Sequence, residues 1–439
     1  MVLLISNTKK ISLILIFILI IGLIFIPILF GLMGSILPSL GFYFDLSSDF
    51  TYEFYVKAFQ IPGIMKSIFL SVFVGIFSTL ISLIASQFIL SKLFSTNFFN
   101  LLSKILYPLI AFPHITMAVG ISFLFSSSGY FVRLFSIFFQ FDRPPNLDLF
   151  PDHYGIFLIL GLILKETPFF LLISIGFLST IKAKEYFYLG KLNKFSDFTS
   201  WILFVFPLIY NKLKITIFIV LIFSATVIDM SIVLAPTTPS TTSIRILQLF
   251  QQPELESFSL ASCLSIIQLA TIIFIIFSWA LFEKLISNQN FMLIIRYFME
   301  KINKHFENIL IIFSVILFLI FVLNILISVM WSISEVWRFP DLLPTKMYLK
   351  NFFVFFMFNS ESFFNSIILA ALGSSISLVI IILWLELLNL LNLKHNFLNS
   401  MFYIPLLLPE LSVLLGFNYF LIRNDFDNKF LNILWIKII

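Results

Sequence analysis

Ionisable side chains stand inside two strongly apolar stretches of the chain. Lys165 and Glu166 are neighbours in LILKETPFF, just before Pro168, and Asp229 lies in ATVIDMSIVL. A charge at the centre of a membrane helix costs about 2.5–3.5 kcal/mol on insertion scales, so such groups usually pair or line a polar pathway. We expect an ion pair between Lys165 and Asp229, with Glu166 protonated or turned towards a wet cavity. These groups either line a solute pathway or its gate, or form a packing pair that fixes the register of two helices.

His114 and Glu410 form a second candidate pair, separated by 296 positions. Each follows a proline, Pro113 or Pro409, that interrupts an apolar tract. If the chain is duplicated, the two side chains lie at corresponding depths beside a central pathway. A histidine in an apolar span can equally be a hydrogen-bonded packing group between helices.

The remaining reactive residue types favour no enzyme. The chain has one cysteine, Cys263, and no stretch of the form G-x-x-x-x-G-K-[ST], which would bind nucleotide phosphates. Its histidines lack the spacing of metal ligands; they are His114, His153, His305 and His395. We therefore expect no catalytic residue, no metal, no bound cofactor and no ATP hydrolysis by this chain.

The composition is that of an integral membrane protein. Of 439 residues, 60% are hydrophobic and only 11% are charged, whereas soluble proteins carry roughly 25% charged residues. The net charge of +5 comes from bases scattered between apolar blocks. Nucleic-acid binding, which needs clustered bases, is therefore not expected.

Nine apolar blocks are long enough to cross a membrane, which takes about 20 residues. The first is longer than the core of a secretory signal, about 7–15 residues, and we expect it to remain as an anchor. Six lysines in residues 182–214 place that loop, and with it the N-terminus, in the cytoplasm. The blocks run roughly over 11–33, 67–90, 105–127, 155–181, 215–235, 259–282, 308–332, 363–385 and 399–421.

Sequence tracts recur at a nearly constant offset. Pro113 and Gly120 reappear as Pro409 and Gly416 at an offset of 296. Met33 and Ser35 reappear as Met330 and Ser332 at an offset of 297. We expect a tandem duplication, with a six-span half over 1–305 and a second half over 306–439 that has three spans and looks truncated. A natural nine-span protein is the alternative.

The lysine-rich segment KAKEYFYLGKLNKFSDFTSWILFVFPLIYNKLKIT begins at Lys182. It resembles the signature E-A-A-x-x-x-G, followed by an apolar stretch and L-P, of permease subunits of binding-protein-dependent ABC importers. Two registers are open. One is anchored on Pro207 and puts Gly190 at the second alanine and Lys194 at the glycine. The other is anchored on Gly190 and puts Glu185 near the glutamate.

The tract VIDMSIVLAPTTP from Val227 is similar to the fused two-domain permeases related to the thiamine and ferric-iron type. The resemblance implies the all-α helical bundle of a type I importer, the MetI-like fold, in a bacterial inner membrane. It also implies two cytoplasmic ATPase subunits, an external solute-binding protein and a small solute. The ATP would then be used by the partner subunits.

A cytoplasmic helix in this segment would dock on an ATPase and transmit its closure to the spans. That role needs a small residue for close approach, apolar docking residues and a firm join to the next span. An amphipathic helix resting on lipid headgroups is the alternative for the segment. A secondary transporter that uses Lys165, Glu166 and Asp229 as an ion relay is the alternative for the whole chain. The candidate coupling residues are Glu185, Tyr186, Leu189, Gly190, Lys194, Phe195 and Pro207.

Overall fold

The fold is taken from a computed structural model, which describes residues 7–42, 50–146, 150–286, 297, 304–391, 393, 398, 401–424 and 429–438. The chain forms two compact units. Unit 1 comprises residues 1–61, 246–269 and 352–439, and unit 2 comprises 62–245 and 270–351. Each unit draws on both predicted halves.

The described chain is almost entirely helical, in agreement with a multi-pass membrane protein. Eight helices within it are long and apolar enough to span a bilayer, and two shorter apolar helices cover Phe98–Ala111 and Glu410–Leu421. Strand structure in the described residues is limited to β1 (Ser334–Val336) and β2 (Lys346–Met347), which pair antiparallel. The coarse fold class is therefore as expected.

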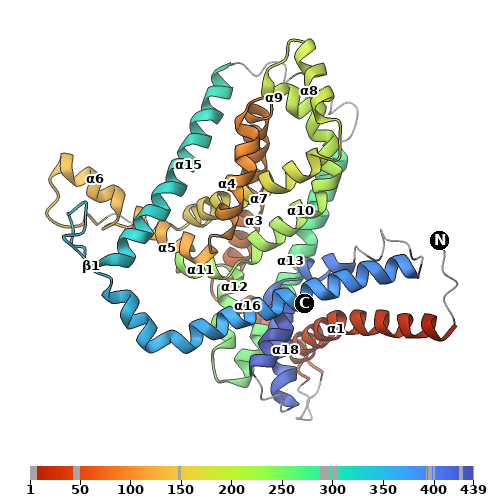
Figure 1. The fold of residues 1–439 in the computed structure, drawn as a ribbon. Coiled ribbons are helices and arrows are strands. Elements are labelled where there is room, and N and C mark those ends of the chain that lie inside the picture. The colour runs from red at the N-terminus through yellow and green to blue at the C-terminus, as the bar shows by residue number, and fades with distance from the viewer. Residues whose placement is uncertain are drawn as a thin grey trace. The chain divides into compact units, whose positions relative to one another are not determined.

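Unit 2 is built around α3, which packs against α7 and α10 (Figure 1). Its buried side chains form two clusters, one around Met117 and Leu162 and the other around Phe170 and Trp201. The helices of unit 2 are α3 (Ile64–Leu93), α4 (Phe98–Ala111), α5 (His114–Phe125), α6 (Tyr130–Phe139), α7 (Ile156–Leu178), α8 (Ala183–Leu192), α9 (Asp197–Ser200), a π-helical turn (Trp201–Val205), α10 (Phe206–Thr226), α11 (Asp229–Leu234) and α15 (Lys304–Ile333). Two further helices, α12 (Thr242–Phe250) and α13 (Leu255–Ile286), have residues in both units.

The third predicted span is a broken helix. α4 ends at Ala111, Phe112 is extended, and α5 begins at His114 directly after Pro113. Proline has no backbone N–H and disfavours a helical conformation in the residue before it, which explains the break. The fifth predicted span is interrupted as well, between the end of α10 at Thr226 and the start of α11 at Asp229.

The ninth predicted span is broken at the matching place. Short 3₁₀ turns cover Met401–Tyr403 and Pro405–Leu407, Leu408 is extended, and α18 (Glu410–Arg423) begins directly after Pro409. The helix starts at His114 and Glu410 are therefore separated by the same 296 residues as the two prolines.

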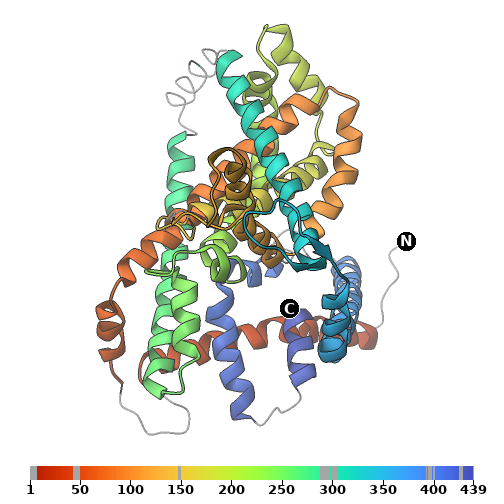
Figure 2. The ribbon, with the colours of Figure 1, turned by 90° about the vertical axis from the view of Figure 1, so that its left-hand side faces the viewer.

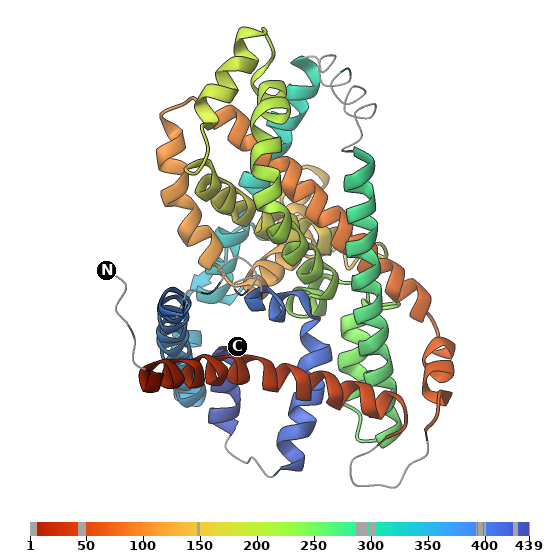
Figure 3. The ribbon, with the colours of Figure 1, turned by 90° about the vertical axis from the view of Figure 1, so that its right-hand side faces the viewer.

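In unit 1, α1 (Asn7–Ser39) crosses α18 at very short range (Figure 3). A Cβ atom on Gly416 would overlap the carbonyl oxygen of Gly31, and one on Gly31 would lie 2.8 Å from a side-chain carbon of Val413. The hydroxyl of Ser35 donates a 2.7 Å hydrogen bond to the carbonyl of Ser412. Glycine is required here because the two backbones touch.

In unit 2, α15 runs as one continuous helix and packs against α5 (Figure 2). A Cβ atom on Gly120 would overlap the side-chain oxygen of Asn324. The amide nitrogen of Asn324 donates a 2.9 Å hydrogen bond to the carbonyl of Met117. Each unit thus joins the predicted first span of one half to the predicted third span of the other.

The rest of unit 1 includes α2 (Glu53–Gln60), α16 (Lys350–Leu390) and α19 (Lys429–Ile438). α16 contains no proline and continues for 41 residues, about 60 Å, so only part of it can cross a hydrocarbon core of about 30 Å. On α2, Lys57 lies 2.8 Å from both Glu53 and Glu256. Hydrogen bonds to Glu256 and then to Glu53 raise the pKa of Lys57 above its ordinary value.

Candidate functional site

The segment that resembles the permease signature folds as α8, α9 and the π-helical turn at one end of unit 2 (Figures 1 and 3). Phe187 of α8 is buried against Phe94 and Trp201, with ring centroids 5.5 and 6.4 Å away. The indole N–H of Trp201 donates a 3.1 Å hydrogen bond to Gln87 Oε1 in α3. One face of α8 is therefore fixed to the bundle.

Gly190 provides a close approach within the chain. A Cβ atom on Gly190 would lie 2.6 Å from Cβ of Ser200, closer than such atoms approach each other. The sequence predicts a contact between this small residue and a partner protein. The structure instead places Ser200 of α9 in front of it, so Gly190 sets the spacing between α8 and α9.

α8 ends in a left-handed turn at Lys194. The φ angle of Lys194 is 61°, a region that favours glycine because it has no Cβ atom. The backbone N–H of Lys194 donates to the carbonyl of Lys191 at 2.9 Å, and the N–H of Phe195 donates to the carbonyl of Gly190 at 3.3 Å. This paired arrangement is the Schellman helix end.

The outward face of α8 is apolar and exposed. Tyr186 is 39% exposed, Tyr188 55%, Leu189 47% and Leu192 79%. Exposed apolar side chains of this size on one short helix mark an interaction surface, either with protein or with the membrane. We call these four residues the α8 face.

Glu185 lies on the same side of α8 as Tyr188 and Leu189, three and four residues further on. It is exposed and lies 3.5 Å from Lys182. Phe195 is half-buried, with its ring 6.2 Å from that of Phe204. Pro207 is the second residue of α10 and directly follows the π-helical turn, so its missing N–H falls where regular α-helical bonding is already interrupted.

Lys165 caps the broken end of α4. Its ammonium group donates a 2.6 Å hydrogen bond to the carbonyl of Ile110 and a second, very short one to the carbonyl of Phe112. These carbonyls lack helical donors because of the break at Pro113. The expected ion pair with Asp229 is not formed in the described structure, since the break offers Lys165 nearer acceptors.

Acidic groups lie at the two helix starts nearby. Glu166 Oε1 lies 3.9 Å from Nε2 of His114, the first residue of α5. Asp229, the first residue of α11, accepts a 2.8 Å hydrogen bond from the backbone N–H of Met230. A negative charge at a helix start interacts favourably with the helix dipole. His114 and Asp229 thus begin helices after a break, and Lys165 and Glu166 of the continuous α7 contact the break before His114. We call these four residues the break cluster.

Glu410, the expected counterpart of His114, has a different environment. It is the first residue of α18 and is exposed. His114 is only partly exposed, and its ring lies 5.0 Å from that of Phe223. The matching helix starts are therefore found, but not matching surroundings for the two side chains.

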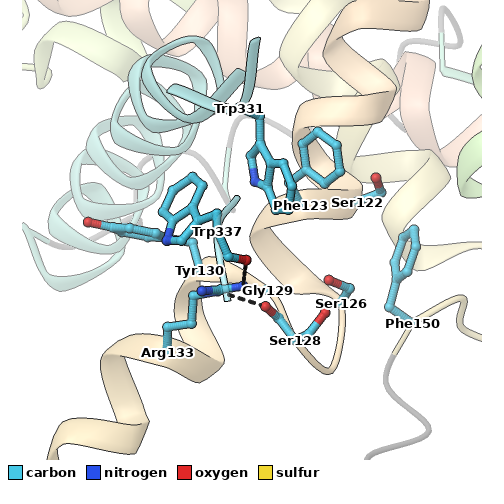
Figure 4. Close-up of a pocket in the computed structure, with 10 residues that line it drawn as sticks. All are labelled: Ser122, Phe123, Ser126, Ser128, Gly129, Tyr130, Arg133, Phe150, Trp331 and Trp337. Atoms are coloured by element: carbon cyan, nitrogen blue, oxygen red, sulfur yellow. Dashed lines mark hydrogen bonds between the residues drawn. The ribbon is translucent and has the colours of Figure 1, made fainter. Parts of the chain in front are cut away.

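A pocket of about 230 Å³ lies beside α6 (Figure 4). Arg133 enters it and is 4% exposed. Its guanidinium group donates to four backbone carbonyls, at 2.9 Å to Ser128, 2.7 Å to Arg338, 2.8 Å to Asp341 and 3.4 Å to Trp337. These bonds clamp the segment after β1 to α6, so this arginine is a structural tie.

The sequence analysis missed this clamp. Arg133 follows the tract SSSG at 126–129, and Trp331 and Trp337 lie two hundred residues further on. An arginine in an apolar context indicates a buried partner. Here the partners are backbone carbonyls, and because every residue has one, the sequence cannot predict which of them bind.

No protein-family model, no curated protein and no solved structure matches the chain. The resemblance to ABC importer permeases therefore depends on the residues and the geometry described above.

Proposed function

We propose that the chain is the membrane-spanning permease of a binding-protein-dependent ABC importer, of the MetI-like type. The observation that carries the proposal is the two-sided character of α8. Phe187 and Gly190 attach one side of the helix to the transmembrane bundle, while the α8 face is exposed and apolar. A lever between a motor subunit and the spans requires both sides.

The geometry also favours one of the two signature registers. In the register anchored on Pro207, Lys194 occupies the position of the glycine, and its φ angle of 61° is the conformation that glycine favours. The same register puts Gly190 at the second alanine, where its contact with Ser200 tolerates only a small residue. It also places Tyr188, rather than Glu185, at the position of the glutamate.

A tandem duplication is part of the proposal. Its support is the pair of helix starts at His114 and Glu410 and the two close crossings at Gly120 and Gly416, all at an offset of 296. The first span of each half then packs against the third span of the other half. Such an exchange would couple the movements of the two halves.

The proposed partners follow from the same resemblance. Two ATPase subunits would dock on the cytoplasmic side, at the α8 face in the first half, and a solute-binding protein would deliver a small solute outside. The N-terminus and α8 would be cytoplasmic in a bacterial inner membrane, as the six lysines at 182–214 favour. When ATP binds, the two ATPase subunits would close and move α8 together with the spans to which it is attached.

The test is co-purification from the native host. A polar charge in the middle of an apolar interface removes most of its affinity, so Leu192→Asp should reduce the ATPase recovered with the permease by about tenfold or more. Tyr154→Asp is the matched control. Tyr154 is 72% exposed and lies in the connection before α7, on the predicted outer side of the membrane. Equal ATPase recovery with both variants, or no nucleotide-binding protein in the wild-type complex, contradicts the proposal.

The break cluster favours a second candidate, a transporter driven by an ion gradient. Interrupted helices with ionisable groups at their ends form the ion and solute sites of many secondary transporters. Transport in sealed vesicles separates the two candidates. Uptake that needs ATP and partner subunits supports the importer. Uptake by this chain alone under an ion gradient, lost in Glu166→Gln, supports the second candidate.

A further inference from the structure

Unit 2 contains an apolar cavity that neither the α8 face nor the break cluster uses. Its volume is about 420 Å³, and it lies between α3, α4, α7 and α15. Among its lining residues only Lys92, Thr167 and Ser314 have polar side chains. An apolar cavity of about 150 Å³ already stays dry and takes up benzene, so a space of this kind suits a larger apolar occupant.

We propose that this cavity binds one acyl chain of a membrane phospholipid. The first argument is its length. The lining residues of α15 run from Ile311 to Phe321, a rise of about 15 Å along a helix. The hydrocarbon of one leaflet is half of about 30 Å, and therefore has the same depth.

The mouth of the cavity lies where lipid can enter. Ile105 of α4 and Val315 and Phe318 of α15 line the cavity and are also exposed. In a helix that crosses a bilayer, exposed apolar side chains face lipid. The deep wall, formed by Leu106, Leu164 and their neighbours, is buried.

An ion pair marks the headgroup end. Lys92 lines the cavity, and its ammonium group lies 2.6 Å from Glu307 Oε2 at the start of α15. An ammonium has three donors, so Lys92 can hold Glu307 and a lipid phosphate together. Phe94, two residues further on, packs on Trp201, so this end lies on the α8 side. Under the proposed function that is the cytoplasmic leaflet.

The corresponding corner of unit 1 is filled by the chain itself. There α1 meets the end of α16 and the 3₁₀ turn at Met401–Tyr403, and the remaining space is about 10 Å³. Trp384 fills it, with ring centroids 4.9 Å from Phe17 and 4.8 Å from Phe402. Phe402 lies 296 residues after Leu106. Phe402 thus packs on Trp384 at the position where the first half has Leu106.

The test is photo-crosslinking of the full chain in vesicles of phosphatidylethanolamine and phosphatidylglycerol. A trace of the phosphatidylglycerol carries a diazirine near the end of one acyl chain, and crosslinked peptides are mapped by mass spectrometry. We expect crosslinks in segments 163–171 and 311–321. Leu106→Trp should lower them about threefold, because the larger ring takes up part of the cavity beside its deep wall, and Leu106→Phe, the residue of the other half, should lower them less.

Leu101→Trp is the matched control. Leu101 is on the same helix and is exposed, and it does not line the cavity, so this variant should leave the crosslinks unchanged. Crosslinks to the exposed Leu281 region of α13 serve as the internal measure of correct folding. If Leu106→Trp fails to fold, the Leu106→Phe comparison decides.

Crosslinks in the two segments that do not exceed those at α13, or that persist unchanged in the folded Leu106 variants, overturn the inference. A further protein segment in the cavity would also abolish the lipid signal and overturn it. Neither result depends on an ATPase, so failure here is distinguishable from failure of the proposed function.

Discussion

The ammonium group of Lys165 lies against the two backbone carbonyls, of Ile110 and Phe112, that the break before Pro113 leaves without helical donors. A buried cation is usually costly in a membrane, and this one is stabilised by charge-assisted hydrogen bonds in a dry setting. Its neighbours Glu166 and Asp229 contribute further electrostatic attraction. Lys165 thus makes the broken helix possible at this depth.

Replacing Lys165 by methionine should therefore destabilise the protein. Two charge-assisted hydrogen bonds, each of about 1.5–3 kcal/mol, are lost, and part of that is offset by the removal of a buried charge, leaving a loss of roughly 2–4 kcal/mol. Thermal unfolding in detergent measures it. Lys184→Met, at an exposed position of α8, should leave the midpoint unchanged. An equal midpoint for both variants would contradict the capping role.

Lys194→Gly should have the opposite sign. A non-glycine residue at a φ angle of 61° costs roughly 1 kcal/mol, which glycine relieves. We expect a gain of about 0.5–1 kcal/mol in the free energy of unfolding, read from the same thermal curves. Lys184→Gly, inside α8, should lose up to about 1 kcal/mol. A loss in both variants would show that the turn at Lys194 is not the end of α8.

Sequence patterns singled out individual residues but did not predict the groups that these residues contact. The cost of a buried charge singled out Lys165, Glu166 and Asp229, of which Lys165 and Glu166 are buried and Asp229 begins α11. It could not predict that Lys165 binds backbone carbonyls, because any carbonyl freed by a break is an acceptor. Likewise, the size of Gly190 predicted a close approach but not that Ser200 of the same chain makes it.

At the scale of helices, the two crossings at Gly120 and Gly416 carry the argument for duplication. At Gly416 the neighbour is the backbone of α1, and at Gly120 it is the side chain of Asn324 on α15. Glycine allows each pair of helices to approach closely enough for hydrogen bonds from Ser35 and Asn324 to backbone carbonyls.

Alanine at either glycine should force the helices apart. For Gly416→Ala and Gly120→Ala we expect losses of about 1–3 kcal/mol, the usual range for overpacking. The larger loss is expected at Gly416, because a backbone cannot move aside. Gly176→Ala is the control: nothing lies within 4 Å of its added Cβ atom, so the helix gains stability. Losses at Gly176 equal to those at Gly416 would refute the close crossings.

Apolar length and proline position predicted most of the elements. All nine predicted spans contain helix in the described residues, but the ninth contains only the short α18, so eight helices rather than nine are long enough to cross a membrane. Pro113 and Pro409 lie at breaks. Helix lengths were predicted wrongly where the sequence has no signal for a helix boundary. Nothing in the apolar pattern marks the start of the continuous helical stretch at Asp197, because the π-helical turn carries the helix past Pro207, which would be expected to break it.

At the scale of the molecule, we propose that a cytoplasmic ATPase pushes on the α8 face. An exposed apolar surface is there joined to a buried attachment through Phe187 and Trp201. Lysine distribution predicts the side of the membrane, and the resemblance to permeases predicts the partner. Composition alone predicts only that the chain crosses the bilayer several times.

The most direct measurement is photo-crosslinking in living cells from a benzoylphenylalanine at position 192, with the same group at position 154 as the control. Leu192 and Tyr154 are both highly exposed, and they lie in connections on opposite sides of the predicted bilayer. The account predicts a crosslink from position 192, and not from position 154, to a nucleotide-binding ATPase subunit. Crosslinks from position 192 only to lipid, or to proteins on the outer side of the cell membrane, would contradict the proposed docking.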